Sequence, residues 1–145
     1  MFKKILVPTD GSDVGGKAAA MAADMAKGSG GQVVGIYVID PFPYIGIGDA
    51  SAVGLQSYLS DAKRVAGAAL DLVAKACQER GVPFAGDTIE RNMVWEGILE
   101  TAKAEGCDLV VMGSHGRQGV KALILGSVAQ KVLTHAELPV LIVKG

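Results

Sequence analysis

The stretch VVMGSHGRQGVKALILGSVAQKVL, Val110–Leu133, joins an apolar run to a glycine-rich segment and then to residues at helical spacing. Its glycines are Gly113, Gly116, Gly119 and Gly126. A glycine inside a regular element costs roughly 0.5–1 kcal/mol relative to alanine, because its unfolded backbone has more freedom to lose. Several glycines so close together indicate a turn with special backbone requirements, placed between a buried strand and a helix.

Outside this stretch, short apolar runs bounded by turn residues recur along the chain and are typical of buried strands. The predicted strands are Lys3–Asp10, Gln32–Asp40, Phe84–Glu90, Asp108–Gly113 and Leu138–Val143. Phe84–Glu90 is the most polar of them, which favours a position at the edge of a sheet.

The segments between these runs carry apolar residues at helical intervals. After Ser12 the predicted buried face is Val14, Ala18, Met21 and Met25, and the glycines of Gly28–Gly31 are expected to end that helix. Further helices are predicted from Leu55 to Ala76, capped by Gly81 and closed by Pro83, from Val94 to Ala102, and from Ser127 onward. The prolines and glycines of Pro41–Ala50 predict a loop.

Strands and helices thus alternate through the chain, with no linker, repeat or low-complexity tract. Alternation of this kind favours crossover helices and parallel strand pairing. We expect an α/β fold in one domain spanning residues 1–145, with an open, parallel, five-stranded sheet and helices on both faces.

Composition excludes several classes of function. The chain has 145 residues, half of them apolar, and a formal net charge of −1. Near-neutral charge without a Lys/Arg cluster argues against nucleic acid or an anionic membrane as the partner. The apolar run near the N-terminus is too short for a secretion signal, and Cys77 and Cys107 lack metal or redox spacing. We therefore expect a cytoplasmic protein with reduced thiols.

In an open parallel sheet, ligands bind beyond the carboxyl ends of the strands. This rule points to Pro8–Asp10, Val38–Asp40 and Met112–Gly116. A turn at Gly113 and Gly116 leaves backbone N–H groups free to face an anion. Ser127 is a candidate N-cap for a helix whose first N–H groups attract phosphate. The alternative is that these glycines only make a turn and that Ser127 only caps its helix.

The spacing Gly113-x2-Gly116-x9-Gly126-Ser127 resembles the G-x2-G-x9-G-[ST] motif of the universal stress protein family. The segments ILVPTDGS, YVID, DLVVMGSHGR, LGSVAQKVL and PVLIVK resemble that family's segments in their order along the chain. The resemblance implies a flavodoxin-like (Rossmann-like) fold and membership of the subgroup that binds ATP.

The resemblance also implies roles for individual residues. Those matching positions around the phosphates and ribose are Gly113, Gly116, Gly126, Ser127 and Val128. Asp10 matches the acidic residue near the nucleotide, Val38 a position whose backbone meets the adenine, and Met112 a neighbour of that site. Pro8 and Thr9 match the strand end that lines the pocket.

Several side chains have two possible roles. Asp10 either contacts the ribose or a Mg²⁺ ion held by the phosphates, or only supports the turn after its strand. Ser114 either contacts the phosphates or makes a local hydrogen bond in the turn. Arg117 either pairs with a phosphate or faces solvent.

Other side chains are interpreted without a ligand. No nucleophile or orienting partner accompanies His115, so it is interpreted as a solvated loop residue. His135 and Trp95 are interpreted as structural.

The predicted function is nucleotide-dependent signalling or regulation in a stress response. Bound ATP is expected to order Pro41–Gly54 and to alter a surface for an unidentified protein partner. A slow Mg²⁺-dependent ATPase or phosphotransferase and a cAMP-binding protein are the alternatives. Leu138–Val143 is apolar on both faces, and the family resemblance implies a homodimer through this strand.

Overall fold

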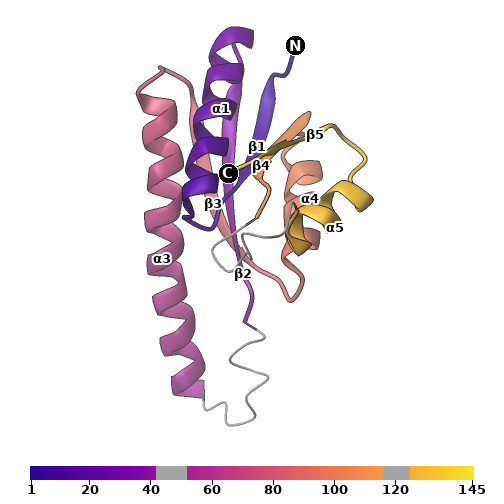
Figure 1. Ribbon diagram of the computed structural model, residues 1–145. Coiled ribbons are helices and arrows are strands. Elements are labelled where there is room, and N and C mark those ends of the chain that lie inside the picture. Colours follow the sequence, from indigo (N-terminus) through magenta and orange to yellow (C-terminus); the bar gives the residue numbers. More distant parts are fainter. Residues whose placement is uncertain (42–51, 116–124) are drawn as a thin grey trace.

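The structure is a computed structural model that describes residues 1–41, 52–115 and 125–145 (Figure 1). Its elements, in chain order, are β1 (Lys4–Pro8), α1 (Asp13–Ser29), β2 (Gln32–Ile39), α3 (Ala52–Gln78), β3 (Phe84–Glu90), α4 (Val94–Ala104), β4 (Leu109–Gly113), α5 (Ser127–His135) and β5 (Val140–Val143). The described residues do not include Gly116, Arg117 or Gly119. Of the predicted loop at Pro41–Ala50, they include only Pro41.

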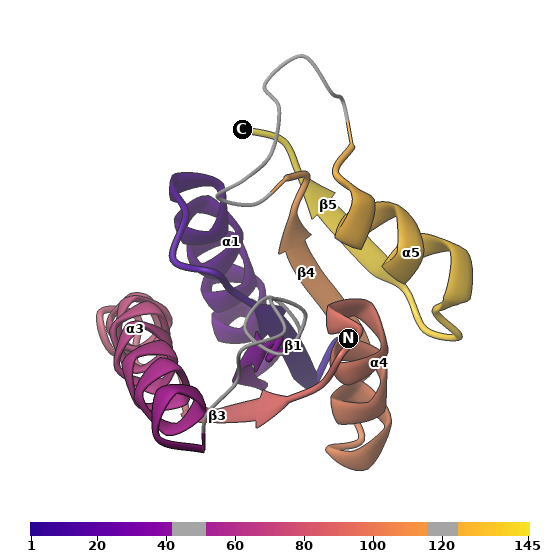
Figure 2. The same ribbon diagram turned by 90° about the horizontal axis from the view of Figure 1, so that it is seen from below.

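All strand pairs are parallel, and the sheet has the order β3-β2-β1-β4-β5. Helices α1 and α3 cover one face, and α4 and α5 cover the other (Figure 2). The prediction of an open, parallel, five-stranded α/β sheet with helices on both faces is therefore confirmed. None of the described helices is both long enough and apolar enough to cross a membrane.

Strand β1 divides the core into two layers. Its central residues Ile5, Leu6 and Val7 are fully buried. Because side chains alternate along a strand, Ile5 and Val7 join the layer beneath α1 and α3, whereas Leu6 joins the layer beneath α4 and α5. A strand that is buried on both faces has a continuous run of apolar residues, and this run is why the sequence predicted β1 clearly.

The chain reverses its direction across the sheet beside β1. From β1 it continues outward through β2 to β3, and it then returns to place β4 and β5 on the opposite side. The connections that leave the carboxyl ends of β1 and β4 therefore diverge. Such a divergence opens the crevice where ligands bind in sheets of this kind.

The predicted buried face of α1 is wrong in one residue and incomplete. Met21 is 42% exposed, and the buried face is built largely from alanines, Ala18, Ala19, Ala22, Ala23 and Ala26. Small side chains let the helix approach the sheet closely, so the large methionine points outward. Residues 28 and 29 also remain helical, and Gly30 ends the helix with a φ of 69°.

Two further boundaries differ from the prediction. Strand β5 begins at Val140 rather than Leu138. The N-cap of α5 is Gly126, and Ser127 is the first helical residue. The predicted edge position of β3 is correct.

The cysteines lie in opposite layers, and both are free thiols. Burial raises the pKa of the Cys107 thiol to about 11 and also raises that of Cys77. Both are neutral at physiological pH, in keeping with a structural role.

Gly31 provides a test of how tightly the chain returns from α1 to the sheet. A Cβ atom at Gly31 would lie 2.7 Å from the carbonyl oxygen of Lys3 and 2.8 Å from that of Phe2. We expect Gly31→Ala to lower the free energy of unfolding by about 1–3 kcal/mol, because backbone atoms must move. Gly28→Ala is the matched control, since nothing lies within 4 Å of its added Cβ. The control should be neutral or stabilise by up to about 1 kcal/mol. Equal midpoints of urea unfolding for the two variants would contradict this account.

Candidate functional site

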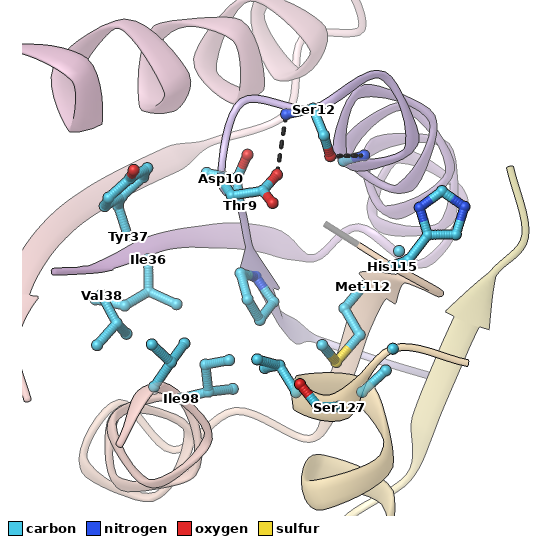
Figure 3. A pocket seen from close by; sticks show the side chains of 17 residues that line it. Thr9, Asp10, Ser12, Ile36, Tyr37, Val38, Ile98, Met112, His115 and Ser127 are labelled. Carbon is cyan, nitrogen blue, oxygen red and sulfur yellow. Dashed lines mark hydrogen bonds between the residues drawn. The ribbon is translucent and has the colours of Figure 1, made fainter. Parts of the chain in front are cut away.

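A cavity of about 590 Å³ lies at the carboxyl ends of β1, β2 and β4 (Figure 3). This volume falls within the range of small-molecule sites, about 300–1,000 Å³. Its apolar side is formed by Ile36 and Val38 of β2, Val94 and Ile98 of α4, and Met112 of β4. Its polar side is formed by the turn after β1 and by the start of α5.

The turn after β1 is held by its own side chains. Thr9 Oγ1 accepts a hydrogen bond from the Gly11 N–H at 3.2 Å, and Asp10 Oδ1 accepts one from the Ser12 N–H at 2.9 Å. Ser12 caps α1 by accepting from the Gly15 N–H at 3.2 Å. Gly11 has a φ of 82°, a left-handed conformation that favours glycine. The sequence TDGS therefore makes a rigid turn, and Asp10 supports that turn while lining the cavity.

The start of α5 presents backbone donors to the cavity. The first intrahelical bond runs from the Gln130 N–H to the Gly126 carbonyl at 3.0 Å, so the N–H groups of Ser127, Val128 and Ala129 precede it. Gly126 has no side chain that could cap them. These donors and the helix dipole favour an anion at this end of the cavity.

Gly126 and Gly113 also have a packing role. The Gly126 N–H donates to the Ser114 carbonyl at 2.6 Å, and a Cβ at Gly126 would lie 3.2 Å from the Cα of His115. A Cβ at Gly113 would lie 2.6 Å from Val14 Cγ1. Both glycines therefore let helices approach the end of β4. This close packing is a second reason for glycine at these positions, besides the needs of the turn.

Most of the candidate residues from the sequence share this cavity. Those that line it are Pro8, Thr9, Asp10, Val38, Met112, Gly113, Gly126, Ser127 and Val128. Ser114 is 2% exposed and lies behind the lining. Gly116 and Arg117 fall outside the described residues.

Sequence reasoning missed other lining residues. Val94 and Ile98 are one helical turn apart, and their apolar spacing predicted a buried face without showing that it borders a cavity. His115, interpreted from the sequence as a solvated loop residue, lies in a bend, is half-buried and lines the cavity. The available signal was its position two residues after a predicted strand, between Gly113 and Gly116.

Within residues 1–41, 52–115 and 125–145, no group of three or more His, Cys, Asp or Glu side chains could hold a metal ion. Asp10 is the single carboxylate among the described residues that line the cavity. One carboxylate alone is a poor Mg²⁺ site, so a metal ion here would need ligands from a bound phosphate.

Trp95 and His135 join the two helices that flank the cavity. Their rings stack with centroids 4.2 Å apart, and His135 Nδ1 lies 2.9 Å from the Lys131 carbonyl oxygen. The structural interpretation of both side chains agrees with this packing.

The model of the universal stress protein family matches residues 1–144 of the chain. A universal stress protein of Methanocaldococcus jannaschii, MJ0531, is 39% identical over 145 residues, which cover 99% of this chain and 83% of that protein. The solved structure of MJ0577, a universal stress protein of the same organism, superposes with a TM-score of 0.87 at 27% identity. That match covers 100% of this chain and 97% of the other.

Two more distant structures contain adenine nucleotides. A universal stress protein in complex with cAMP has a TM-score of 0.70 at 19% identity, covering 99% of this chain and 97% of its own. One from Archaeoglobus fulgidus in complex with dAMP has a TM-score of 0.67 at 20% identity, covering 97% of each chain. At these identities the likeness shows the shared fold.

The contact between Gly113 and Val14 can be tested with a double-mutant cycle. Gly113→Ala should lower the free energy of unfolding by about 1–3 kcal/mol, because its Cβ would overlap Val14 Cγ1. Val14→Ala removes that atom, so the double variant should lose at least about 0.5 kcal/mol less than the sum of the single variants. Strict additivity in denaturant unfolding would show that Gly113 is required for another reason.

Proposed function

The chain belongs to the universal stress protein family, and we propose that it binds an adenine nucleotide, with ATP the preferred ligand, in the cavity at the ends of β1, β2 and β4. The observation that carries this proposal is the union of an apolar slot and a helix N-terminus within one cavity. The cAMP and dAMP complexes of distant relatives with the same fold support the ligand class.

The apolar side of the cavity suits a flat aromatic base. Val38 and Ile36 lie on β2, and Ile98 of α4 faces them in Figure 3. The buried surface of an adenine ring would be stabilised there by removal from water. The backbone of Val38 is the proposed partner for the polar edge of the base.

In the proposed complex, the phosphates of the nucleotide lie at the polar side of the cavity. The N–H groups of Ser127 and Val128 are the proposed donors, and Gly113 and Gly126 let the chain approach closely. Gly116 and Arg117 remain candidates from the sequence alone. When present, Mg²⁺ would neutralise phosphate charge, with Asp10 at the same end of the cavity.

The proposed role of this binding is regulatory, in a cytoplasmic stress response. Among the described lining residues, the polar groups are backbone donors, hydroxyls, the His115 imidazole and the carboxylate of Asp10, which already holds the turn through the Ser12 N–H. Such groups bind and orient a nucleotide. A partner protein would then respond to the nucleotide-bound form.

We also propose that two copies pair through β5. The carbonyls of Pro139 and Val143 face β4, where they accept from Val110 and Ser114. The alternation of a strand therefore turns the backbone groups of Val140 and Ile142 toward the open edge.

The opposite edge of the sheet is less available. On β3 the outward N–H of Thr88 is occupied by Asp87 Oδ1 at 2.8 Å. Acidic side chains at Asp87 and Glu90 further discourage pairing there, whereas β5 is wholly apolar.

Nucleotide binding is tested by calorimetric titration of the nucleotide-free protein with Mg·ATP. Ser127→Asp and Ser127→Asn are nearly the same size and differ in charge. We expect micromolar binding by the native protein and by Ser127→Asn. The aspartate should weaken binding at least about tenfold by repelling phosphate, while it stabilises the start of α5. Competition between ATP and cAMP shows whether the site prefers the cyclic nucleotide. No heat of binding with ATP or cAMP would refute the proposed function.

The dimer is tested by sedimentation of Val140→Pro, with Val140→Ala as the matched control. Proline removes an edge N–H but leaves the ladder to β4 intact, because residue 140 faces away from it. We expect dimers for the native protein and the alanine variant, and monomers for the proline variant. A native protein that sediments as a monomer would exclude this interface.

A further inference from the structure

We propose that His115 recognises the terminal phosphates of the nucleotide and so makes the site prefer di- and triphosphates to monophosphates. This inference rests on the proposed nucleotide binding and adds a specificity residue to it. His115 lies two residues after the end of β4 and is half-buried in the lining of the cavity.

The backbone at His115 is fixed on two sides. The preceding Ser114 donates its N–H to the Val143 carbonyl at 2.9 Å and accepts from the Gly126 N–H at 2.6 Å. The missing Cβ of Gly126 would lie 3.2 Å from the Cα of His115. The Cα of His115 is thus held against the start of α5, on the same side of the cavity as the proposed phosphate donors.

The direction of the cavity places His115 beyond those donors. In Figure 3, Val38 and Ile98 lie at one side, Ser127 lies between, and His115 lies at the opposite side. With a base at Val38 and the first phosphate near Ser127, further phosphates extend toward the imidazole. A monophosphate would end before it.

His115 is also the single basic side chain among the described residues that line the cavity. Titratable groups on the surrounding elements are Asp10 after β1, Asp13 in the first turn of α1, and Lys144 after β5. The first turn of α5 contains no acidic residue. Gly145 also lies close, since a Cβ there would be 3.6 Å from His115 Nε2. A protonated imidazole in this setting would donate a charge-assisted hydrogen bond to a phosphate oxygen.

The test compares ATP, ADP and AMP affinities by calorimetry at constant Mg²⁺, at about pH 6 and about pH 8. The variants are His115→Gln and His135→Gln. The second is the matched control, because the chain has two histidines and His135 stacks on Trp95 outside the cavity lining. At the lower pH, His115→Gln should weaken ATP binding about tenfold and change AMP binding less than about twofold.

The pH dependence gives an independent readout. ATP titrates its own phosphate in this range, so the informative quantity is the difference between native protein and variant. The native protein and His135→Gln should gain more ATP affinity on acidification than His115→Gln does. Equal ATP-to-AMP ratios and equal pH effects in all three proteins would overturn the role of His115 and leave nucleotide binding intact. Absence of ATP binding by the native protein would instead refute the proposed function itself.

A measurement on the native protein guards against a misfolded variant. The imidazole NMR signals of His115, assigned with His135→Gln, should shift on addition of ATP and far less on addition of AMP. Identical responses to the two nucleotides would overturn the inference.

Discussion

The structure depends on burying β1 at the centre of the sheet. Ile5, Leu6 and Val7 are fully removed from water, and both edges of the strand are paired, to β2 and β4. Because β1 is central, β2 and β4 lie on its opposite sides, and the connections that leave the carboxyl ends of β1 and β4 diverge. The crevice at the carboxyl end of β1 is therefore a consequence of the strand order, and the polar turn Thr9–Ser12 lies at that crevice because it follows β1.

Gly113 at the end of β4 and Gly126 at the start of α5 let helices pack closely against the sheet, and the same close packing exposes backbone donors to the cavity. Gly113 lets Val14 of α1 pack against the strand, and Gly126 lets the start of α5 lie against His115 and Ser114. A side chain at either position would push a helix away from the sheet. The same close approach leaves the first N–H groups of α5 facing the cavity without a side-chain cap. Packing and proposed phosphate binding therefore require the same residue type, which is why sequence reasoning could not separate them.

The sequence predicted the sheet well because its strands are continuous apolar runs. It also pointed to the carboxyl ends of β1, β2 and β4, where the structure has a cavity. It predicted the face of α1 less well. Large apolar residues such as Met21 dominate a periodicity argument, but alanines make the contact when a helix packs closely. The N-cap of α5 was placed one residue late, because Ser127 has good capping chemistry and the observed cap, Gly126, has no side chain. The sequence did not show that His115 lines the cavity, since the position of this segment depends on hydrogen bonds of Ser114 with Gly126 and Val143, which are distant in sequence.

The distribution of charge within the cavity bears on the kind of function it supports. Among the described lining residues, the carboxylate of Asp10 and the imidazole of His115 are the acidic and basic groups, and the remaining polar contacts come from hydroxyls, backbone and Tyr37. One carboxylate oxygen of Asp10 is engaged by the Ser12 N–H. Hydrolysis or phosphoryl transfer by general base catalysis requires a base that takes a proton from the attacking water or hydroxyl and is held within hydrogen-bond reach of it. A cavity in which the acidic group shapes a turn and the donors belong to a helix start is suited to holding a nucleotide. This arrangement supports the proposed role in nucleotide binding.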